Sequence, residues 1–256
     1  MTTRTTDLAT VAGWLRTAGR VTVLTGAGIS TDSGIPDFRG PNGVWTRNPE
    51  AAKLVTLDAY VADPAVRQKA WRTRRDHPAW TAEPNAGHRA LVELERTGRL
   101  HAIVTQNIDG LHQKAGSDAG RVIEVHGTIS EVVCLDCADR NPMTHALDRV
   151  DAGEPDPACQ RCGGILKSAT VSFGQSLDGA TIRRAFAAAA ACDLFLAVGT
   201  SLQVYPVAGM VEIAGQAGAK TVIVNASPTP YDEYVDAVIR EPIGDVLPAL
   251  VAPTAA

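Results

Sequence analysis

Four of the five cysteines form two Cys-x-x-Cys pairs, and this is the most specific chemical pattern in the chain. The pairs are Cys134 with Cys137 and Cys159 with Cys162, separated by residues 138–158. That spacer is one residue longer than the common range for two-knuckle zinc sites, whose connecting loops tolerate insertions. Four thiolates leave no open coordination position, so we expect one structural zinc per chain. A thioredoxin-like redox pair is disfavoured because two pairs are present.

A glycine-rich turn follows an apolar, β-branched run near the N-terminus. The run Val21–Thr25 ends at Gly26, and Gly28 follows. These glycines allow a tight turn and the approach of a diphosphate, at which a helix beginning near Ile29 would aim its N–H groups. The next glycine, Gly34, comes too late for Gly-x-Gly-x-x-Gly, and no acidic residue follows at the distance expected for a ribose partner. The turn is a candidate dinucleotide site, with an ordinary turn as the alternative.

Polar residues also follow other apolar runs at the point where each is expected to end. Gln106, Asn107 and Asp109 follow one run, residues 199–201 follow another, and Asn225 ends a third. Open α/β sheets bind ligands outside the carboxyl ends of their strands. These residues therefore predict a ligand site. For the motifs at residues 199–201 and at Asn225, each taken singly, strand-ending turn chemistry is about equally favoured.

One of the six histidines, His126, ends an apolar run just before a glycine and the cysteine-bearing segment. A neutral imidazole at such a place can act as a general base near pH 7. The other five are interpreted as surface or satisfied core residues: His77, His88, His101, His112 and His145.

Four short runs that are apolar on both faces predict the parallel sheet that must position these residues. They are Val21–Thr25, Ala102–Thr105, Asp193–Val198 and Thr221–Val224. Helical patterns lie between them, and the clearest spans residues 84–98, with Asn85 as its cap and Gly98 as its stop. Further helices are expected over residues 8–19, 181–190 and 206–218. This alternation predicts a doubly wound α/β core.

Two segments interrupt the alternation. Residues 51–87 carry tryptophans and contain no strand candidate, and residues 127–168 carry the cysteine pairs. We expect them to form a helical module and a zinc module that pack together as a small domain. The Rossmann-like domain would comprise residues 1–50, 88–126 and 169–256.

The composition of the 256 residues excludes several classes of protein. The chain is 45% hydrophobic and 20% charged, which is ordinary for a globular protein with a sizeable core. A net charge of −4 and a pI of about 5.9 argue against a nucleic-acid binder. No signal-peptide pattern or run of membrane-spanning length is visible, so we expect a cytoplasmic protein that binds neither membrane nor nucleic acid.

Seven motifs in this order resemble the sirtuin family of NAD-dependent protein lysine deacylases. The resemblance runs from about residue 8 to residue 250, which is nearly the whole chain. The motifs are Gly26–Ser30, Ser33–Arg39, Thr105–Asp109, Val125–Gly127, the two cysteine pairs, Gly199–Ser201 and Val224–Asn225.

The resemblance implies a Rossmann-type domain joined to a small domain of zinc and helical modules, with NAD and acyl-lysine meeting between them. It places the diphosphate of NAD on Gly26, Ala27, Gly28 and Ser30. It places the adenosine end on Gly199, Thr200, Ser201 and Asn225, with Ile243 over the adenine. Ser33 and a mobile loop of Asp37, Phe38 and Arg39 would cover the nicotinamide half, which Gln106, Asn107, Ile108 and Asp109 would face.

The implied chemistry assigns the base to His126, with Asn107 and Asp109 beside the reacting groups. Nicotinamide leaves as the acyl oxygen attacks the ribose C1′, and His126 then takes a proton from the ribose hydroxyls. The products are free lysine and 2′-O-acyl-ADP-ribose. An apolar lid such as Phe38 would keep water out of the first step.

The substrate side departs from the family pattern. Residues 167–175 read Lys-Ser-Ala-Thr-Val-Ser-Phe-Gly-Gln, where many members have Lys-Pro-Asp and then Phe-Phe-Gly-Glu. Val171 and Phe173 keep apolar positions expected along the acyl-lysine tunnel. Gln175 replaces a carboxylate, which puts peptide affinity in doubt and leaves the reaction unchanged.

Acyl preference depends on the helix near residue 70. Sirtuins that remove succinyl or malonyl groups carry a tyrosine and, three residues later, an arginine, and alignment puts Trp71 and Arg74 at these positions. Arg74 could pair with a distal carboxylate, whereas indole offers one donor and more bulk. We favour the alternative in which Arg74 belongs to a solvated run with Arg72 and Arg75, so deacetylation is the expected main activity.

Other functions remain as alternatives to protein deacetylation. A desuccinylase, a demalonylase or a protein mono-ADP-ribosyltransferase would use the same cleft. A non-enzymatic NAD sensor is disfavoured because binding alone needs no base such as His126 beside the ribose. The sequence leaves the physiological substrates and the oligomeric state open.

Overall fold

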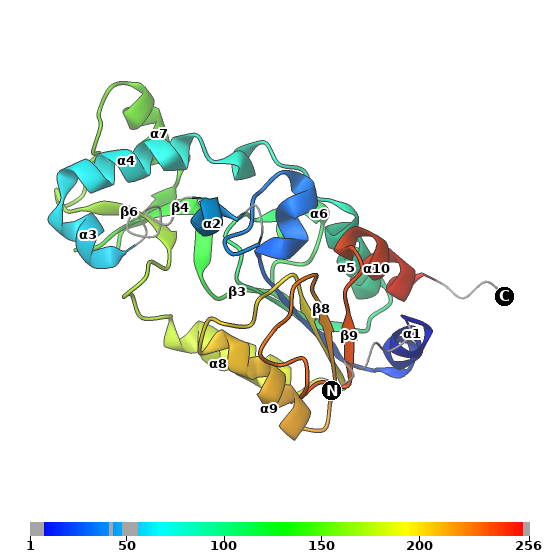
Figure 1. Ribbon diagram of the computed structural model, residues 1–256. Helices are drawn as coiled ribbons and strands as arrows, with labels where there is room; N and C mark the ends of the chain where they lie inside the picture. Colours follow the sequence, from blue (N-terminus) through cyan, green and yellow to red (C-terminus); the bar gives the residue numbers. More distant parts are fainter. Residues whose placement is uncertain (1–7, 41–42, 48–55, 253–256) are drawn as a thin grey trace.

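A six-stranded parallel sheet forms the centre of the larger lobe. The computed structural model describes residues 8–40, 43–47 and 56–252. The strand order is β3-β2-β1-β7-β8-β9, and every neighbouring pair is parallel (Figure 1). The strands are β1 (Val21–Thr25), β2 (Leu100–Thr105), β3 (Val122–Glu124), β7 (Leu194–Val198), β8 (Lys220–Val224) and β9 (Ala237–Ile239). The order reverses direction at β1, so a ligand crevice is expected outside the carboxyl ends of β1 and β7.

Helices cover both faces of this sheet, which explains why its strands are apolar on both sides. On one face Val23 packs with Leu15, Leu91 and Leu247, and on the other Leu24 belongs to a separate buried cluster. The first face is covered by α1 (Leu8–Thr17), α5 (Ala86–Arg96) and α10 (Ile243–Val251). The second is covered by α8 (Gly179–Ala190) and α9 (Met210–Gln216) (Figure 1). The predicted doubly wound α/β fold is confirmed.

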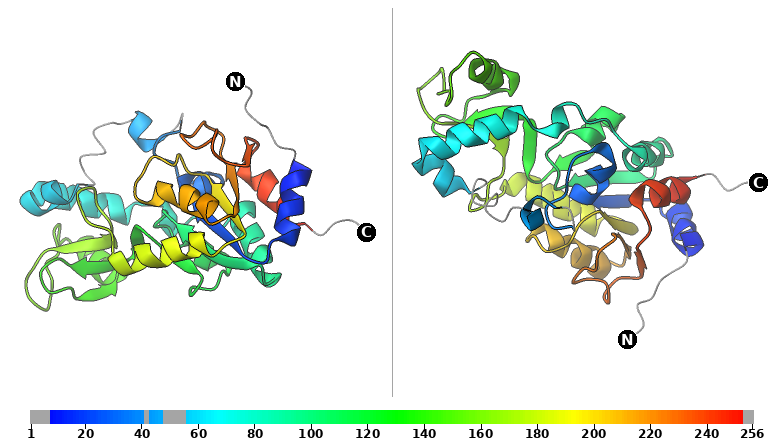
Figure 2. Two further views of the ribbon diagram at one scale, coloured as in Figure 1. Left: turned by 90° about the horizontal axis from the view of Figure 1, so that it is seen from below. Right: turned by 45° about the horizontal axis from the view of Figure 1, so that its top comes forward.

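A three-stranded antiparallel sheet, in the order β5-β4-β6, forms the centre of a smaller lobe at one end of the molecule (Figure 2). Its elements are β4 (Gly127–Cys134), β5 (Arg140–Pro142), α7 (Thr144–Asp151) and β6 (Leu166–Thr170). The helices α3 (Leu57–Ala62) and α4 (Pro64–Arg75) pack on it. Trp71 is buried with Cys134 and Cys159, and Tyr60 Oη donates to Leu166 O at 2.7 Å. The helical and zinc segments therefore share one core, while the domain boundaries stay a prediction.

Most expected elements are present with small shifts at their ends. The predicted strand from Asp193 begins one residue later, at Leu194, and the carboxylate of Asp193 accepts from the backbone N–H groups of Gly19 and Arg20. The helix α5 begins after Asn85, whose side chain and that of His88 form a reciprocal capping box. The region expected as one helix over residues 206–218 is split into a short 3-10 helix and α9. The apolar run before His126 forms the short strand β3, and the short strand β9 was not predicted.

Shorter helical segments connect these elements. They are a 3-10 helix at Ala27–Ser33, α2 (Val44–Arg47), 3-10 helices at Pro78–Trp80 and Val207–Gly209, and α6 (Leu111–Ala115). Between residues 56 and 87 we find helices and one isolated bridge from Thr56 to Phe173. Residues 51–55 of the expected helical module lie outside the described part, and the module itself stays a prediction. None of the helices in the described ranges has the length and apolar character required to cross a membrane.

Candidate active site and metal centre

The four paired cysteines converge on one point. Their sulfur atoms all lie within 4.8 Å of one another. The Sγ atoms of Cys134 and Cys162 are 3.5 Å apart, and those of Cys137 and Cys159 are 3.8 Å apart. Zinc bound tetrahedrally at about 2.3 Å requires sulfur atoms about 3.8 Å apart, so the four thiolates fit one zinc ion with no open position. The group fits a structural metal and offers no place for a substrate.

The glycine turn after β1 is packed against the turn after β7. A Cβ atom on Gly26 would lie 2.7 Å from Gly199 O, and one on Gly28 would lie 2.7 Å from Gly199 Cα. The N–H of Gly28 donates to Gly199 O at 2.9 Å, and helical structure begins at Ala27 rather than near Ile29. Glycine is needed here because two backbones touch at the switch point. The contact between the two turns is therefore a reason for glycine at positions 26 and 28 in addition to the expected one, which is the approach of a diphosphate.

Side chains from two distant motifs, Ser30 from one and Asn107 and Asp109 from the other, form one hydrogen-bonded group beside this turn. Ser30 Oγ donates to Asp109 Oδ2 at 2.7 Å, and Asn107 Nδ2 donates to Ser30 Oγ at 3.2 Å and to Gly26 O at 3.1 Å. The backbone N–H of Leu111 donates to the other oxygen of Asp109 at 3.0 Å. Burial raises the pKa of Asp109, and these hydrogen bonds oppose that rise.

Gln106 joins this group to the turn after β7. Its side-chain Nε2 donates to Thr200 Oγ1 at 2.9 Å, and its backbone N–H donates to Thr25 O at 3.0 Å. Its backbone carbonyl accepts from His126 Nδ1 at 3.0 Å. Loops after β1, β2 and β7 and the predicted base therefore belong to one network, which is what a site at the carboxyl ends of the strands requires.

The contact with Gln106 also determines the tautomer of His126. A carbonyl oxygen can only accept, so Nδ1 of His126 carries the proton and Nε2 keeps its lone pair. Burial lowers the pKa of His126, and the hydrogen bond to Gln106 O partly offsets this. The imidazole is therefore held neutral near pH 7, oriented as a general base must be.

The predicted lid is folded on itself. Asp37 Oδ1 accepts from Gly40 N at 3.1 Å, and Asp37 O accepts from Val44 N at 2.8 Å. Phe38 is 43% exposed, and partial burial lowers the pKa of Arg39. The structure thus places the exposed Phe38 in a surface turn that is closed by Asp37.

Ser33 and Ile108 both have structural contacts. Ser33 Oγ accepts from Asn85 Nδ2 at 2.9 Å, and the same nitrogen donates to Ile29 O at 2.7 Å. Asn85, expected only as a helix cap, therefore also ties the glycine turn to α5. Ile108 packs against a buried cluster that contains Leu111 and Ile129.

The predicted adenosine end lies where β8 and β9 finish. Asn225 follows β8 and is half-buried, and its Nδ2 donates to Ser227 O at 2.8 Å. Ile243 begins α10 and packs partly against the large-lobe core, close to where a Cβ of Gly87 would lie. Arg240, which had no signal in the sequence, bonds to the loop after Asn225.

The segment after β6 contains the predicted substrate residues. Val171 N donates to His126 O at 2.8 Å, which brings this segment directly beside the base. Phe173 is 47% exposed, and its carbonyl accepts from Leu57 N at 2.9 Å. Gln175 Oε1 accepts from Ser172 N at 3.2 Å, so this side chain caps its own turn.

The expectation that Arg74 belongs to a solvated run is wrong. Arg72 and Arg75 are exposed, whereas Arg74 is half-buried and donates to Ser168 Oγ at 3.0 Å. Burial lowers the pKa of Arg74 to about 10. Trp71 is 2% exposed inside the small-lobe core, and its indole N–H has no acceptor among the described residues.

Two histidines interpreted as ordinary core residues are buried without full hydrogen bonding. His112 Nε2 and Thr25 Oγ1 are 2.9 Å apart, and the rings of His112 and His88 lie 5.0 Å apart. His88 Nε2 and His112 Nδ1 have no partner among the described residues. Burial lowers the pKa of His88 to about 4 and that of His112 to about 3. Thr25 directly precedes Gly26, so the contact of His112 with Thr25 supports the end of β1 from which the glycine turn begins. Residue spacing alone could not show this contact.

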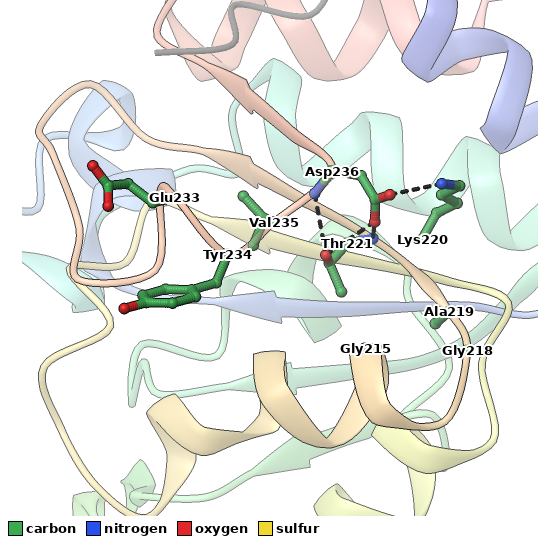
Figure 3. A pocket seen from close by; sticks show the side chains of 9 residues that line it. All are labelled: Gly215, Gly218, Ala219, Lys220, Thr221, Glu233, Tyr234, Val235 and Asp236. Carbon is green, nitrogen blue, oxygen red and sulfur yellow. Dashed lines mark hydrogen bonds and ion pairs between the residues drawn. The ribbon is translucent and has the colours of Figure 1, made fainter. Parts of the chain in front are cut away.

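A hollow of about 490 Å³ lies elsewhere, between α9 and the segment before β9 (Figure 3). Three of its polar residues are paired with one another, since Asp236 accepts from Lys220 Nζ at 2.6 Å and from Thr221 N at 2.9 Å. These residues lie at the amino ends of β8 and β9, opposite the edge at which open α/β sheets bind ligands. None of the predicted site residues lines it.

The fold and the network define an α/β protein with a polar network at the switch point of its sheet and, in its second lobe, four cysteines that could hold a metal ion. A model of the Sir2 family matches residues 26–206. The chain belongs to the Sir2 family, and the predicted resemblance is confirmed.

Relatives and solved structures agree with this assignment. The chain is 57% identical over 231 residues to NAD-dependent protein deacetylase 2 of Streptomyces coelicolor, covering 90% of this chain and 96% of that protein. It is 44% identical over 232 residues to an NAD-dependent protein deacetylase of Rhodopseudomonas palustris, covering 90% of each. A solved structure of Sir2 with a p53 peptide and NAD+ matches with a TM-score of 0.85 at 32% identity, covering 94% of this chain and 96% of that one.

Proposed function

We propose that this protein is an NAD-dependent protein lysine deacetylase, which transfers the acyl group to ADP-ribose and releases nicotinamide. Its family membership and its similarity to named deacetylases support this. One observation of the site carries the proposal furthest. The network that runs from His126 through Gln106 to Thr200 connects a neutral, oriented imidazole to the turn expected to hold NAD.

We assign the contacts of NAD from the family resemblance, and this arrangement supports the assignment. The turn that begins at Gly26 faces the diphosphate, Asn225 and the turn at Gly199 face the adenosine, and Asp109 faces the nicotinamide carboxamide. Ser30 and Asn107 hold Asp109 in place, since they form a chain of hydrogen bonds that ends on its carboxylate. A side chain held on two sides is preorganised for the transition state.

The reaction then divides between substrate and protein groups. The acyl oxygen attacks C1′ of the ribose and nicotinamide leaves, while the lid that carries Phe38 excludes water. His126 Nε2 accepts a proton from a ribose hydroxyl. The 2′ oxygen then attacks the acyl carbon, whose oxygen the first step has bonded to C1′ as an imidate. Hydrolysis releases the free lysine and 2′-O-acyl-ADP-ribose. The position of Val171, bonded to the carbonyl of His126, supports a peptide lying beside the base.

A second candidate, removal of a succinyl or malonyl group, is favoured by the surroundings of Arg74. Its guanidinium bonds to a neutral hydroxyl, and within the described residues no carboxylate forms an ion pair with it. The unsatisfied indole N–H of Trp71 lies one helical turn earlier. Both groups could donate to a carboxylate oxygen, so activity on acidic acyl groups is expected to be measurable.

Protein mono-ADP-ribosylation would use the same site. The four thiolates expected to bind zinc favour a reducing compartment such as the cytoplasm. One experiment separates these functions. The protein is mixed with NAD and an acetyl-lysine peptide, and nicotinamide, O-acetyl-ADP-ribose and labelled protein are measured. Nicotinamide and O-acetyl-ADP-ribose in equal amounts support deacetylation. Nicotinamide with ADP-ribosylated protein alone supports the transferase, and no nicotinamide at all supports a sensor. His126→Ala is the matched inactive control.

A further inference from the structure

The first part of the loop from Asn225 to Asp232 has little apolar anchoring, since the apolar contact of the loop comes near its end, where Tyr231 packs against a buried cluster. The loop joins β8 to the segment before β9, and residues 226–228 at its tip are exposed. A loop of this kind is ordered by its hydrogen bonds rather than by burial. The groups that hold the loop therefore decide whether Asn225 is presented correctly.

Arg240, at the end of β9, supplies most of these bonds. Its Nη1 donates to Asn225 O at 2.7 Å and to Ser227 O at 2.8 Å, and its Nη2 pairs with the carboxylate of Asp232. The exposed fractions of the Arg240 and Asp232 side chains are only 27% and 13%. One guanidinium thus holds the beginning and the end of the loop, a geometry that its planar fork permits and an ammonium does not.

The carbonyl of Ser227 links Arg240 to the side chain of Asn225. This oxygen accepts from Arg240 Nη1 and also from Asn225 Nδ2, both at 2.8 Å. One N–H of the Asn225 amide is thereby held by this carbonyl, and we expect its Oδ1 to accept from a ligand hydroxyl. If Arg240 is replaced, the carbonyl of Ser227 loses its hydrogen bond from the guanidinium, and the side chain of Asn225 is then held by a less fixed partner.

The same loop is tied to the neighbouring turn. Thr229 Oγ1 donates to Asp232 Oδ1 at 2.8 Å, and the hydroxyls of Tyr231 and Tyr205 are 3.0 Å apart. Tyr205 lies four residues after Ser201, in the loop that follows the turn at Gly199. Arg240 therefore supports both loops expected at the adenosine end.

We propose that Arg240 is a positioning residue for the adenosine end of NAD, acting through Asn225. This inference rests on the proposed function, because it takes Asn225 as a ligand of the adenosine. The apparent dissociation constant of a ligand rises in inverse proportion to the fraction of molecules with a competent loop. If loss of the clamp leaves about a tenth of the molecules competent, NAD and ADP-ribose bind about tenfold more weakly.

The test measures ADP-ribose binding by calorimetry and NAD kinetics in the full-length protein. We expect Arg240→Met to weaken ADP-ribose binding about tenfold and to raise KM for NAD by the same factor, with kcat and the KM for the acetylated peptide unchanged. The affinity of Arg240→Lys for ADP-ribose should lie between those of the unaltered protein and Arg240→Met, because lysine keeps a cation for Asp232 but cannot bridge both carbonyls. Arg99→Met is the matched control, since Arg99 also donates to a backbone carbonyl, Leu15 O at 3.2 Å, but at the amino end of β2.

A double-mutant cycle shows whether Arg240 acts through Asn225. Arg240→Met combined with Asn225→Ala should bind ADP-ribose no more weakly than Asn225→Ala alone, because the two residues act in series. Additive losses, or an Arg240→Lys variant with unchanged binding, would overturn the inference. If the unaltered protein does not bind ADP-ribose, the proposed function is wrong and the inference with it. If it binds and Arg240→Met binds equally well, only the inference is overturned.

Discussion

Acidification should destabilise this protein through the two buried imidazoles beneath the site, His88 and His112. Both side chains are at most 1% exposed. Burial lowers the pKa of His88 to about 4 and that of His112 to about 3, against about 6.5 in the unfolded chain. Below pH 6.5 the unfolded state therefore binds more protons than the folded state. The contribution of these neutral imidazoles to stability is fully present above pH 6.5 and is lost as the pH falls toward 4.

The size of the effect follows from these values. At pH 5 an unfolded imidazole with a pKa of 6.5 is almost fully protonated, while the folded one is not. Each histidine then costs about 2 kcal/mol relative to pH 7, or about 4 kcal/mol for the pair, at 1.36 kcal/mol per pH unit. That is a large part of the 5–15 kcal/mol typical of a folded domain.

The variant His88→Gln isolates this contribution. Glutamine three residues after the cap Asn85 preserves the capping box of α5, so the substitution removes the titration and keeps the local geometry. Urea denaturation followed by circular dichroism at pH 7 and pH 5 gives the loss for each protein. We expect the loss to be about 2 kcal/mol smaller in His88→Gln than in the unaltered protein.

Comparing the two proteins also removes other acid effects. Protonation of the zinc thiolates and of Asp109 is common to both and cancels in the difference. His145→Gln, on α7, is the control and should leave the loss unchanged. Equal losses in the unaltered protein and in His88→Gln would refute the reasoning.

The remaining predictions concern the metal, the base and the acyl group. Serine at Cys134 or Cys159 should lower the melting temperature of the small lobe, because a structural zinc supplies folding free energy, and metal analysis should find one zinc per unaltered chain. Much less zinc in active protein would contradict this. His126→Ala should reduce kcat by about 10²–10⁴-fold with NAD binding retained, and the acid limb of kcat/KM should lie below pH 6.5 because burial lowers the pKa of His126. Near-normal turnover in His126→Ala would exclude it as the base. On one peptide carrying acetyl-lysine or succinyl-lysine, catalytic efficiency should favour acetyl, and Arg74→Met should reduce only the succinyl activity. A preference for succinyl that Arg74→Met abolishes would reverse the assignment of acyl specificity.

Several features follow from the sequence because their signals are local. The cysteine pairs, the glycines after β1 and the cap at Asn85 depend on residue type and spacing within a few positions. Runs that are apolar on both faces indicate parallel strands wherever they occur. The order of seven motifs was enough to indicate the family, which the comparisons confirm.

Other features were decided only by tertiary structure, because they depend on which segments meet. Arg74 has the same local pattern as the exposed Arg72, and only packing of α4 on β6 buries it against Ser168. Arg240 is one charged residue after a short strand, and its role appears only when the loop at Asn225 folds back onto it.

The crowding of Gly26 against Gly199 likewise needs β1 and β7 to be neighbours. These contacts join residues far apart along the chain, and hydrogen bonds and burial at such separations leave no periodicity in the sequence. Residue types and spacing therefore determined the fold class, the zinc ligands and the candidate base. Burial, tautomer and the clamp on the adenosine loop were decided by which surfaces the folded chain brings together.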